Sequence, residues 1–145
     1  MPGTMRILNN ISRCQAMYRR RSVGLDDLFP SHYAFVLSIS HSPGRSQEEL
    51  ARELCVDKST VARVLACMEK NGYITRAPNE KDRRQTLVYP TEKMLEACPE
   101  IKKANRAWTD RLTAGVSPEE LDVFHRVLER MEESAKTIME ELEEK

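Results

Sequence analysis

The sequence has no long hydrophobic run, few glycines and no excess of either charge. No stretch approaches the roughly 18 consecutive apolar residues that a membrane-spanning helix needs, so we expect no membrane segment. The first 21 residues contain five arginines but no compact apolar run, which predicts that there is no signal peptide and that the protein is cytoplasmic. Five glycines and seven prolines among 145 residues argue against a disordered chain.

Motifs for metal binding and for catalysis are also missing. The four cysteines, Cys14, Cys55, Cys67 and Cys98, have neither the paired spacing of a zinc site nor the pattern of a secreted disulfide framework. The three histidines join no cluster at ligand spacing, so we expect no metal and no cofactor. Because the sequence has no glycine-rich phosphate loop and no nucleophile–base–acid set, we predict that the protein is not an enzyme.

The zero net charge conceals an uneven distribution of charge. Residues 117–145 contain ten acidic and four basic residues, whereas residues 58–84 contain seven Lys or Arg and three Asp or Glu. A neutral chain with one basic stretch and one acidic end indicates an anionic partner at one place only.

Apolar residues recur at helical spacing over almost the whole chain. The segments 1–24 and 92–145 predict long helices with one apolar side, with a kink at Cys98-Pro99 and a new helix start at Ser117. A long helix with one apolar side cannot bury that side against so small a middle region. It needs the other terminal helices or a second copy of the chain.

Residues 47–68 fit a helix-turn-helix. Ser46 and Glu49 have the spacing of a capping box, Asp57 can cap the second helix, and Asn71-Gly72 can end it. Cys55 stands where such turns often have glycine, which argues against a sharp left-handed turn at that position. A three-residue turn through Cys55, Val56 and Asp57 is still compatible with the sequence.

The second of these helices begins with groups that suit DNA. Lys58, Ser59 and Thr60 offer an ammonium and two hydroxyls, and Arg63 adds a guanidinium one turn later. These groups match base edges and phosphates in a major groove, and the helix dipole favours a nearby phosphate. The alternative is a buried helical hairpin with solvated charges, and this pattern alone does not decide between the two.

A β-hairpin with a charged tip follows. Two β-prone runs, 73–77 and 86–89, flank polar residues at 78–85. The tip carries Lys81, Arg83 and Arg84, and Arg76 stands at its base. Crowded positive charges repel one another in a fold but are attracted to phosphates or to a narrow minor groove. Asp82 is expected to hold one guanidinium through a bidentate pair, the alternative being a solvated turn acid.

These motifs resemble those of MarR-type transcription regulators. Asp82-Arg83-Arg84, followed by Val88 and Thr91, matches the Asp-x-Arg signature of the family's wing, and the segments Leu50 to Leu54, Thr60 to Arg63 and Asn71 to Ile74 are also similar. The resemblance is strongest over about 45–95, although the helix order covers the whole chain. Departures at Phe29, Pro90 and Met94 concern how the wing joins the next helix and leave the DNA-contacting set intact.

The resemblance implies a mainly α fold with a small β-hairpin wing. A single domain over 1–145 would contain a winged helix-turn-helix lobe at about 31–91, flanked by dimerisation helices at 1–24 and 92–145. The implied function is a homodimeric repressor that binds a pseudo-palindromic double-stranded DNA operator and is released by a small ligand or by oxidation. The expected DNA-binding residues are Ser46, Gln47, Lys58, Ser59, Thr60, Arg63, Arg76, Lys81, Asp82, Arg83 and Arg84.

Within that set, the resemblance gives each group a place on the duplex. Residues 58–60 and Arg63 would face the major groove, and Arg84, oriented by Asp82, would enter the minor groove. Ser46 and Gln47 would lie near phosphates.

Candidate sensor residues lie in the first helix and the start of the second, namely Cys14, Met17, Tyr18, His32, Tyr33 and Val36. The one-turn spacing of Cys14 and Tyr18 resembles the peroxide-sensing branch of the family, where a nearby hydroxyl stabilises a thiolate. An apolar cysteine at the dimer interface is the favoured alternative, since Leu28 stands where a further tyrosine is expected. A ligand pocket around His32 and Tyr33 is the other candidate, and the same residues suit a core.

One other class of function stays open from the sequence alone. The chain could be a helical protein-interaction adaptor whose basic hairpin docks on an acidic protein.

Overall fold

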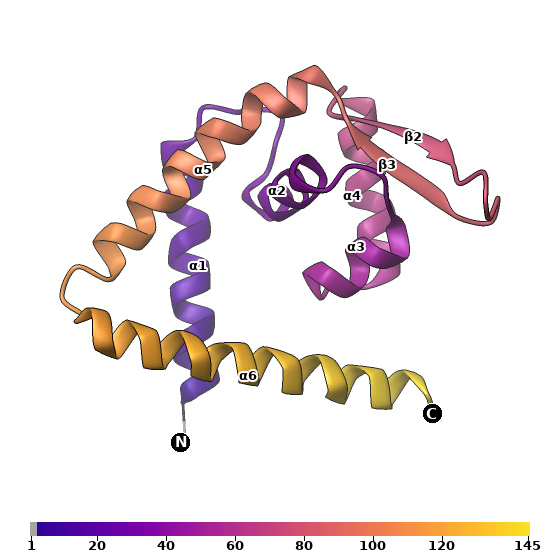
Figure 1. The fold of residues 1–145 in the computed structure, drawn as a ribbon. Helices are drawn as coiled ribbons and strands as arrows, with labels where there is room; N and C mark the ends of the chain where they lie inside the picture. The colour runs from indigo at the N-terminus through magenta and orange to yellow at the C-terminus, as the bar shows by residue number, and fades with distance from the viewer. Residues whose placement is uncertain (1–2) are drawn as a thin grey trace. The chain divides into compact units, whose positions relative to one another are not determined.

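The computed structural model describes residues 3–145, which form a mainly helical chain with one small antiparallel sheet (Figure 1). In chain order the elements are α1 (Thr4–Ser22), the 3₁₀ helix η1 (Pro30–His32), α2 (Tyr33–His41), β1 (Arg45–Ser46), α3 (Gln47–Leu54), α4 (Lys58–Lys70), β2 (Ile74–Pro78), β3 (Thr86–Pro90), α5 (Glu92–Leu112) and α6 (Pro118–Glu143). The expected fold, mainly α with a hairpin wing, is confirmed. The chain forms two compact units, one ending at Trp108 and the other running from Thr109 to Lys145.

Side-chain caps start α3 and α4 where the sequence predicted them. The Ser46 hydroxyl accepts a hydrogen bond from the amide of Glu49 at 3.2 Å. The Asp57 carboxylate accepts one from the amide of Thr60 at 2.8 Å. Gly72, with a φ of 80°, follows the end of α4 in a left-handed conformation that costs glycine little. These local signals set the limits of the helix-turn-helix.

The turn between α3 and α4 differs from the expectation. Cys55 has a φ of 53° and a ψ of 44°, so the argument against a left-handed turn there was wrong. The left-handed residue lets the amide of Val56 reach the carbonyl oxygen of Ala51 at 3.1 Å, which closes the end of α3. Among the described residues, Cys55 is the one non-glycine with positive φ. The helix ending therefore imposes this conformation on a residue that adopts it at a cost of about 1 kcal/mol.

The wing is a three-stranded sheet in the order β1-β3-β2. β2 and β3 pair antiparallel, with Ile74 opposite Pro90. The two residues of β1 add a further edge, with Arg45 opposite Val88. The hairpin was predicted, but β1 was not, because two residues cannot show the alternation that marks a strand. β1 joins the start of α3 directly to the wing.

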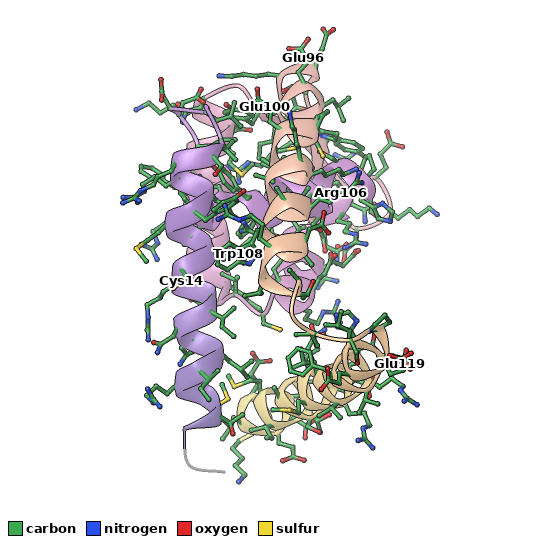
Figure 2. The ribbon with its side chains drawn as sticks, turned by 90° about the vertical axis from the view of Figure 1, so that its left-hand side faces the viewer. Cys14, Glu96, Glu100, Arg106, Trp108 and Glu119 are labelled. Carbon is green, nitrogen blue, oxygen red and sulfur yellow. The ribbon has the colours of Figure 1, made fainter. Side chains whose placement is uncertain are left out.

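In the first unit, α1 lies beside α5, with Trp108 between them (Figure 2). The ring of Tyr18 is 5.3 Å from that of Trp108. Arg19 Nε donates to Asn105 Oδ1 at 2.8 Å. These contacts link the start of the chain to the helix that follows the wing.

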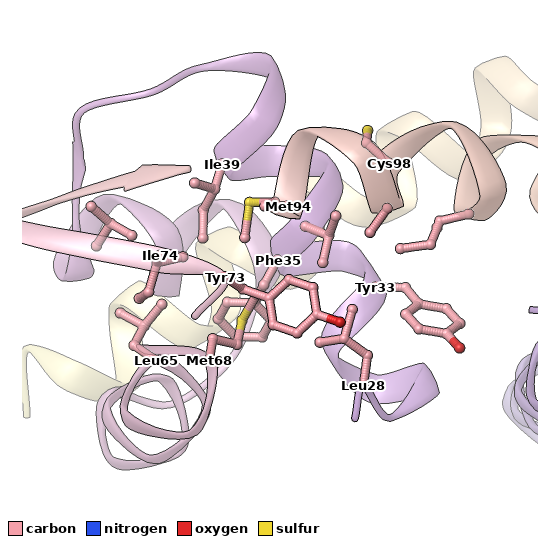
Figure 3. Close-up of a cluster of buried hydrophobic side chains, with 14 of the residues drawn as sticks. Leu28, Tyr33, Phe35, Ile39, Leu65, Met68, Tyr73, Ile74, Met94 and Cys98 are labelled. Carbon is pink, nitrogen blue, oxygen red and sulfur yellow. The ribbon is translucent and has the colours of Figure 1, made fainter. Parts of the chain in front are cut away.

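One apolar core joins α2, α4, the wing and the beginning of α5 (Figure 3). Val61, Leu65 and Met68, spaced four and three residues apart on α4, are fully buried at 0% exposure. Tyr73 and Ile74 from the start of the wing pack in the same cluster, together with residues of α2 and α5. Because its inner side is completely covered, α4 must turn its polar side outward.

A polar cluster holds the base of the wing. Asp27 accepts hydrogen bonds from Lys93 Nζ at 2.6 Å and from the Tyr73 hydroxyl. Lys93 also donates to the carbonyl oxygen of Asn71 at 2.8 Å. The donors Lys93 and Tyr73 keep the pKa of Asp27 below its ordinary value, so the carboxylate stays charged at neutral pH. The segment before η1 is thereby tied to the end of α4 and the start of α5.

The helices that follow the wing begin where the sequence predicted. Thr91 Oγ1 accepts from the amide of Met94 at 3.4 Å at the start of α5, and this helix continues through Pro99. α6 begins with a complete capping box between Ser117 and Glu120. Among the described residues, no helix is long and apolar enough to cross a membrane.

The second unit exposes a row of large apolar side chains, the α6 stripe, in a single copy of the chain. It comprises Val123, Phe124, Val127, Met131, Ile138, Met139 and Leu142. A long amphipathic helix with this side in water is stable only when another surface covers it.

The conformation of Cys55 generates a first prediction. Replacing Cys55 with Val should lower the free energy of unfolding by about 1–2 kcal/mol, because a β-branched side chain is poorly tolerated in left-handed backbone. Cys55→Gly should leave it unchanged or raise it by up to about 1 kcal/mol. Urea denaturation of both variants measures the difference. Equal destabilisation by Val and Gly would instead point to the thiol contact with the Arg52 carbonyl.

Candidate nucleic-acid interface

The first turn of α4 is organised around Asp57. The Ser59 hydroxyl donates to Asp57 Oδ1 at 2.6 Å, and the Thr60 hydroxyl donates to Asp57 Oδ2 at 2.7 Å. Arg63 Nη2 in turn donates to Thr60 Oγ1 at 3.1 Å. The hydroxyls of Ser59 and Thr60 and the amide of Thr60 hold the pKa of Asp57 well below its ordinary value, so the carboxylate is ionised at neutral pH.

The polar groups of this turn face away from the core. Lys58, Ser59 and Arg63 are exposed and Thr60 is half-buried, whereas Val61 on the other side of the helix is fully buried. The four residues predicted to face a major groove therefore lie on one outward surface of α4. The sequence predicted Asp57 only as a helix cap. The structure shows that its carboxylate also accepts hydrogen bonds from the hydroxyls of Ser59 and Thr60.

Arg84 projects from the wing tip under the control of Asp82. Arg84 Nε and the Arg84 backbone amide both donate to Asp82 Oδ1, each at 3.2 Å. The Arg84 side chain is nonetheless 92% exposed. Asp82 orients the arginine, but through one carboxylate oxygen and one guanidinium N–H, so the bidentate form of the predicted pair was wrong. The arrangement leaves the remaining guanidinium donors free to meet a ligand.

The tip itself is a closed turn built by polar side chains. Asn79 Oδ1 accepts from the amide of Lys81 at 3.0 Å, and Asn79 Nδ2 donates to Gln85 Oε1 at 3.1 Å. The amide of Asn79 also reaches the carbonyl oxygen of Gln85 at 3.0 Å. Lys81 and Arg83 are exposed on this turn. The charged side chains at the tip therefore project from a turn whose conformation is held by hydrogen bonds.

Three other candidates are engaged within the lobe. Arg76 Nη1 donates to Gln47 Oε1 at 2.9 Å, and Arg76 Nε lies 3.4 Å from Glu69 Oε2. Ser46 is fully buried, and its hydroxyl contacts Glu49 both as a cap and as a donor. In this structure Arg76 braces the wing against α3 and α4, and the Ser46 hydroxyl is occupied in starting α3.

The sensor candidates fall into two groups. Cys14 and Met17 are exposed on α1, whereas Tyr33 and Val36 belong to the core of the first unit. Within residues 3–145, no hydrogen bond joins Cys14 to Tyr18, and the Tyr18 ring contacts Trp108 instead. The structure therefore groups Tyr18 with the α1–α5 contact and leaves the Cys14 thiol on the surface of a single copy.

His32 is buried with one ring nitrogen unsatisfied. Its Nδ1 has no hydrogen-bond partner in the described part of the chain. Its ring meets that of Phe29 edge-on, with centroids 5.3 Å apart. Burial lowers the pKa of His32, so the imidazole is neutral at physiological pH. The next residue, Tyr33, carries the guanidinium of Arg19 over its ring, with the guanidinium carbon 5.9 Å from the ring centre.

Comparison with known proteins assigns this arrangement to a family. The family model for the MarR family matches residues 28–86. The uncharacterized HTH-type transcriptional regulator YybA of Bacillus subtilis is 30% identical over 105 residues, covering 72% of this chain and 70% of the relative. A crystal structure of MarR superposes with a TM-score of 0.81 at 30% identity and covers 97% of this chain and 95% of that one. The chain belongs to the MarR family.

As a MarR family member, the protein is a DNA-binding transcription regulator, which decides against the interaction adaptor. A MarR family regulator from Listeria monocytogenes, solved in complex with a 26mer DNA, shares the fold. Its TM-score is 0.87 at 22% identity, and the match covers 99% of this chain and 96% of that one. The profile match spans η1 to the start of β3, the part of the MarR lobe that carries α4 and the wing tip.

His32 provides a pH-dependent prediction for this MarR protein. Because burial lowers the pKa of His32 in the folded state, the unfolded chain takes up the proton first as the pH falls. The neutral, buried imidazole of His32 should therefore contribute fully to the free energy of unfolding above the unfolded pKa of about 6.5, and this contribution should decline below that pH. Guanidinium denaturation of wild type and His32→Gln at pH 7.5 and 5.5, at one protein concentration, isolates it. If the free energy of unfolding fell equally in both proteins between pH 7.5 and 5.5, His32 would not be the source of the pH dependence.

Proposed function

We propose that this MarR family protein is a homodimeric repressor that reads a pseudo-palindromic operator with α4 in the major groove and the wing tip in the minor groove. The observation that carries the proposal is the pairing of an outward polar turn on α4 with an exposed, oriented Arg84, both within one compact unit. The DNA carried by the Listeria monocytogenes regulator of the same fold supports duplex DNA as the ligand.

On α4 the groups divide by chemistry. Lys58 and Arg63 are exposed cations, and Arg63 is steered by its hydrogen bond to Thr60. A steered guanidinium suits bidentate contact with a guanine edge, whereas a lysine ammonium suits a phosphate. The outward side of α4 therefore combines sequence reading with electrostatic attraction.

The wing supplies a second, mainly electrostatic contact. Arg84 is exposed and aimed by Asp82, which fits insertion into a narrow minor groove where the negative potential is concentrated. Lys81 and Arg83 on the same turn suit the flanking phosphates. Since these contacts release counterions, binding should weaken steeply as salt rises.

A second copy of the chain is the proposed partner of the α6 stripe. The apolar side chains of this stripe are exposed in one copy, and α1 likewise exposes Met5, Ile7 and Ile11. Isologous pairing of such helices places two reading lobes about a two-fold axis. The half-sites of the operator would then lie roughly 34 Å, one helical turn, apart.

We assign control of DNA release to the surroundings of His32 and Arg19. The imidazole of His32 is buried with an unsatisfied nitrogen, and the half-buried guanidinium of Arg19 lies against the ring of the next residue, Tyr33. These groups suit a small anionic or phenolic effector, and they belong to the elements that link α1 and α5 to the lobe. Oxidation of the exposed Cys14 is the competing trigger, and peroxide treatment of Cys14→Ser compared with wild type separates the two.

Arg84→Ala tests the wing assignment. The substitution should weaken binding to a selected operator duplex by about tenfold or more and make binding less sensitive to salt, because one cationic contact per lobe is lost. Lys103→Ala, which removes an equal charge from an exposed position on α5, is the control and should change affinity little. Fluorescence anisotropy at several salt concentrations measures both. Equal affinity of Arg84→Ala and wild type would remove the minor-groove role.

Met131→Glu tests the dimer. A charge placed within the α6 stripe should shift the protein toward monomers and reduce operator binding by at least tenfold, because burying an unpaired carboxylate is costly. Glu140→Lys, a charge change three residues before the end of α6 and outside the stripe, should remain dimeric. Sedimentation equilibrium gives the masses. A dimeric Met131→Glu protein would place the interface elsewhere.

A further inference from the structure

In the first turn of α4, the hydroxyl protons of Ser59 and Thr60 are already donated to Asp57. Asp57 is exposed but ionised, and an ionised carboxylate can only accept hydrogen bonds. The Ser59 and Thr60 oxygens lie 2.6 and 2.7 Å from the two carboxylate oxygens. Each hydroxyl must therefore donate its single proton to Asp57, so neither retains a proton to offer to a ligand.

This leaves Ser59 as an acceptor on the surface of α4. Its side chain is exposed, and in the described residues its hydroxyl has no hydrogen-bond partner other than Asp57. Thr60 is different, because it is half-buried and already accepts from Arg63 at 3.1 Å. Of the two hydroxyls, Ser59 is the exposed one and the one with both lone pairs still available to DNA.

An acceptor is restricted in what it can bind on a duplex. Phosphate oxygens, guanine O6, thymine O4 and the purine N7 are acceptors themselves, so none of them can donate to Ser59. The donors in the major groove are the exocyclic amino groups, N6 of adenine and N4 of cytosine. The negative charge of Asp57 beside Ser59 also disfavours a phosphate at this position.

We propose that Ser59 reads an exocyclic amino group of adenine or cytosine, and that Asp57 is the positioning residue that fixes the Ser59 hydroxyl as an acceptor. The inference rests on the proposed function, because it requires α4 to lie in the major groove. It deepens that function by assigning the hydrogen-bonding sense of one specificity-determining residue.

The test starts from a duplex selected by the full-length wild-type protein from a randomised 30-base-pair library. Binding of wild type and Ser59→Ala to single-substitution duplexes locates the base pair at which the variant loses its preference. At that pair, the amino group is then deleted by replacing adenine with purine or cytosine with 2-pyrimidinone. In a second duplex, the purine N7 is removed by a 7-deazapurine.

Deleting the amino group should weaken wild-type binding by about three- to tenfold, the loss of one hydrogen bond. It should leave Ser59→Ala unaffected, which also controls for any change in base pairing. The 7-deazapurine should leave the wild-type affinity unchanged. The reverse pattern, sensitivity to N7 and indifference to the amino group, would show that the hydroxyl donates and would overturn the proposal.

Asp57→Ser tests the positioning role. Serine caps a helix as well as aspartate does, so α4 keeps its start while both hydroxyls lose their carboxylate acceptor. Circular dichroism confirms the fold. Affinity for the unmodified duplex should stay within a few-fold of wild type, but the discrimination against the amino-deleted duplex should fall to about twofold or less. If Asp57→Ser discriminated against the amino-deleted duplex as strongly as wild type, Asp57 would not be what fixes the Ser59 hydroxyl as an acceptor.

The outcomes separate this inference from the proposed function. If wild type enriches no shared sequence from the library, sequence reading by α4 fails and the inference fails with it. If wild type enriches a pseudo-palindrome but the amino deletion costs nothing at any pair that Ser59→Ala affects, the proposed function stands and the role of Ser59 is refuted.

Discussion

The orientation of α4 depends on the complete burial of one side of that helix. Val61, Leu65 and Met68 are inaccessible to solvent and pack against α2, the wing and the start of α5. Burying each such side chain stabilises the fold by about 1.5–3 kcal/mol. Because the core is close-packed, few other orientations of α4 would fit it. A rotation of α4 by one residue would expose this side and bury charge. The outward position of Ser59 and Arg63 is therefore a consequence of the core.

Features with local causes could be predicted from the sequence. Helix starts at Ser46, Asp57 and Ser117 were predictable because a cap needs only a side-chain oxygen and an amide two or three residues later. The hairpin was predictable because its strands are neighbours along the chain and flank a polar turn. The orienting role of Asp82 followed from its place between the basic residues Lys81 and Arg83.

Features that depend on distant partners, or on the positions of backbone and side-chain atoms, could not be predicted. β1 is a strand only because β3 lies beside it, and Arg76 turns inward only because Gln47 and Glu69 lie within reach. The left-handed Cys55 reflects the closing of α3, which overrides the preference of the residue type. The hydrogen bonds from both hydroxyls to Asp57 required side-chain positions, since the spacing alone was equally consistent with hydroxyls free to donate.

Hydrogen bonds and an ion pair tie α4 closely to the wing across the short connection between α4 and β2. The amide of Tyr73 bonds to the Met68 carbonyl at 2.8 Å, that of Gly72 bonds to Glu69 at 3.0 Å, and Arg76 pairs with Glu69 across the joint. In the proposed complex, α4 and the wing tip would therefore meet the two grooves of the duplex at a fixed separation. Sequences whose groove width already suits that separation would gain affinity at bases that no side chain touches.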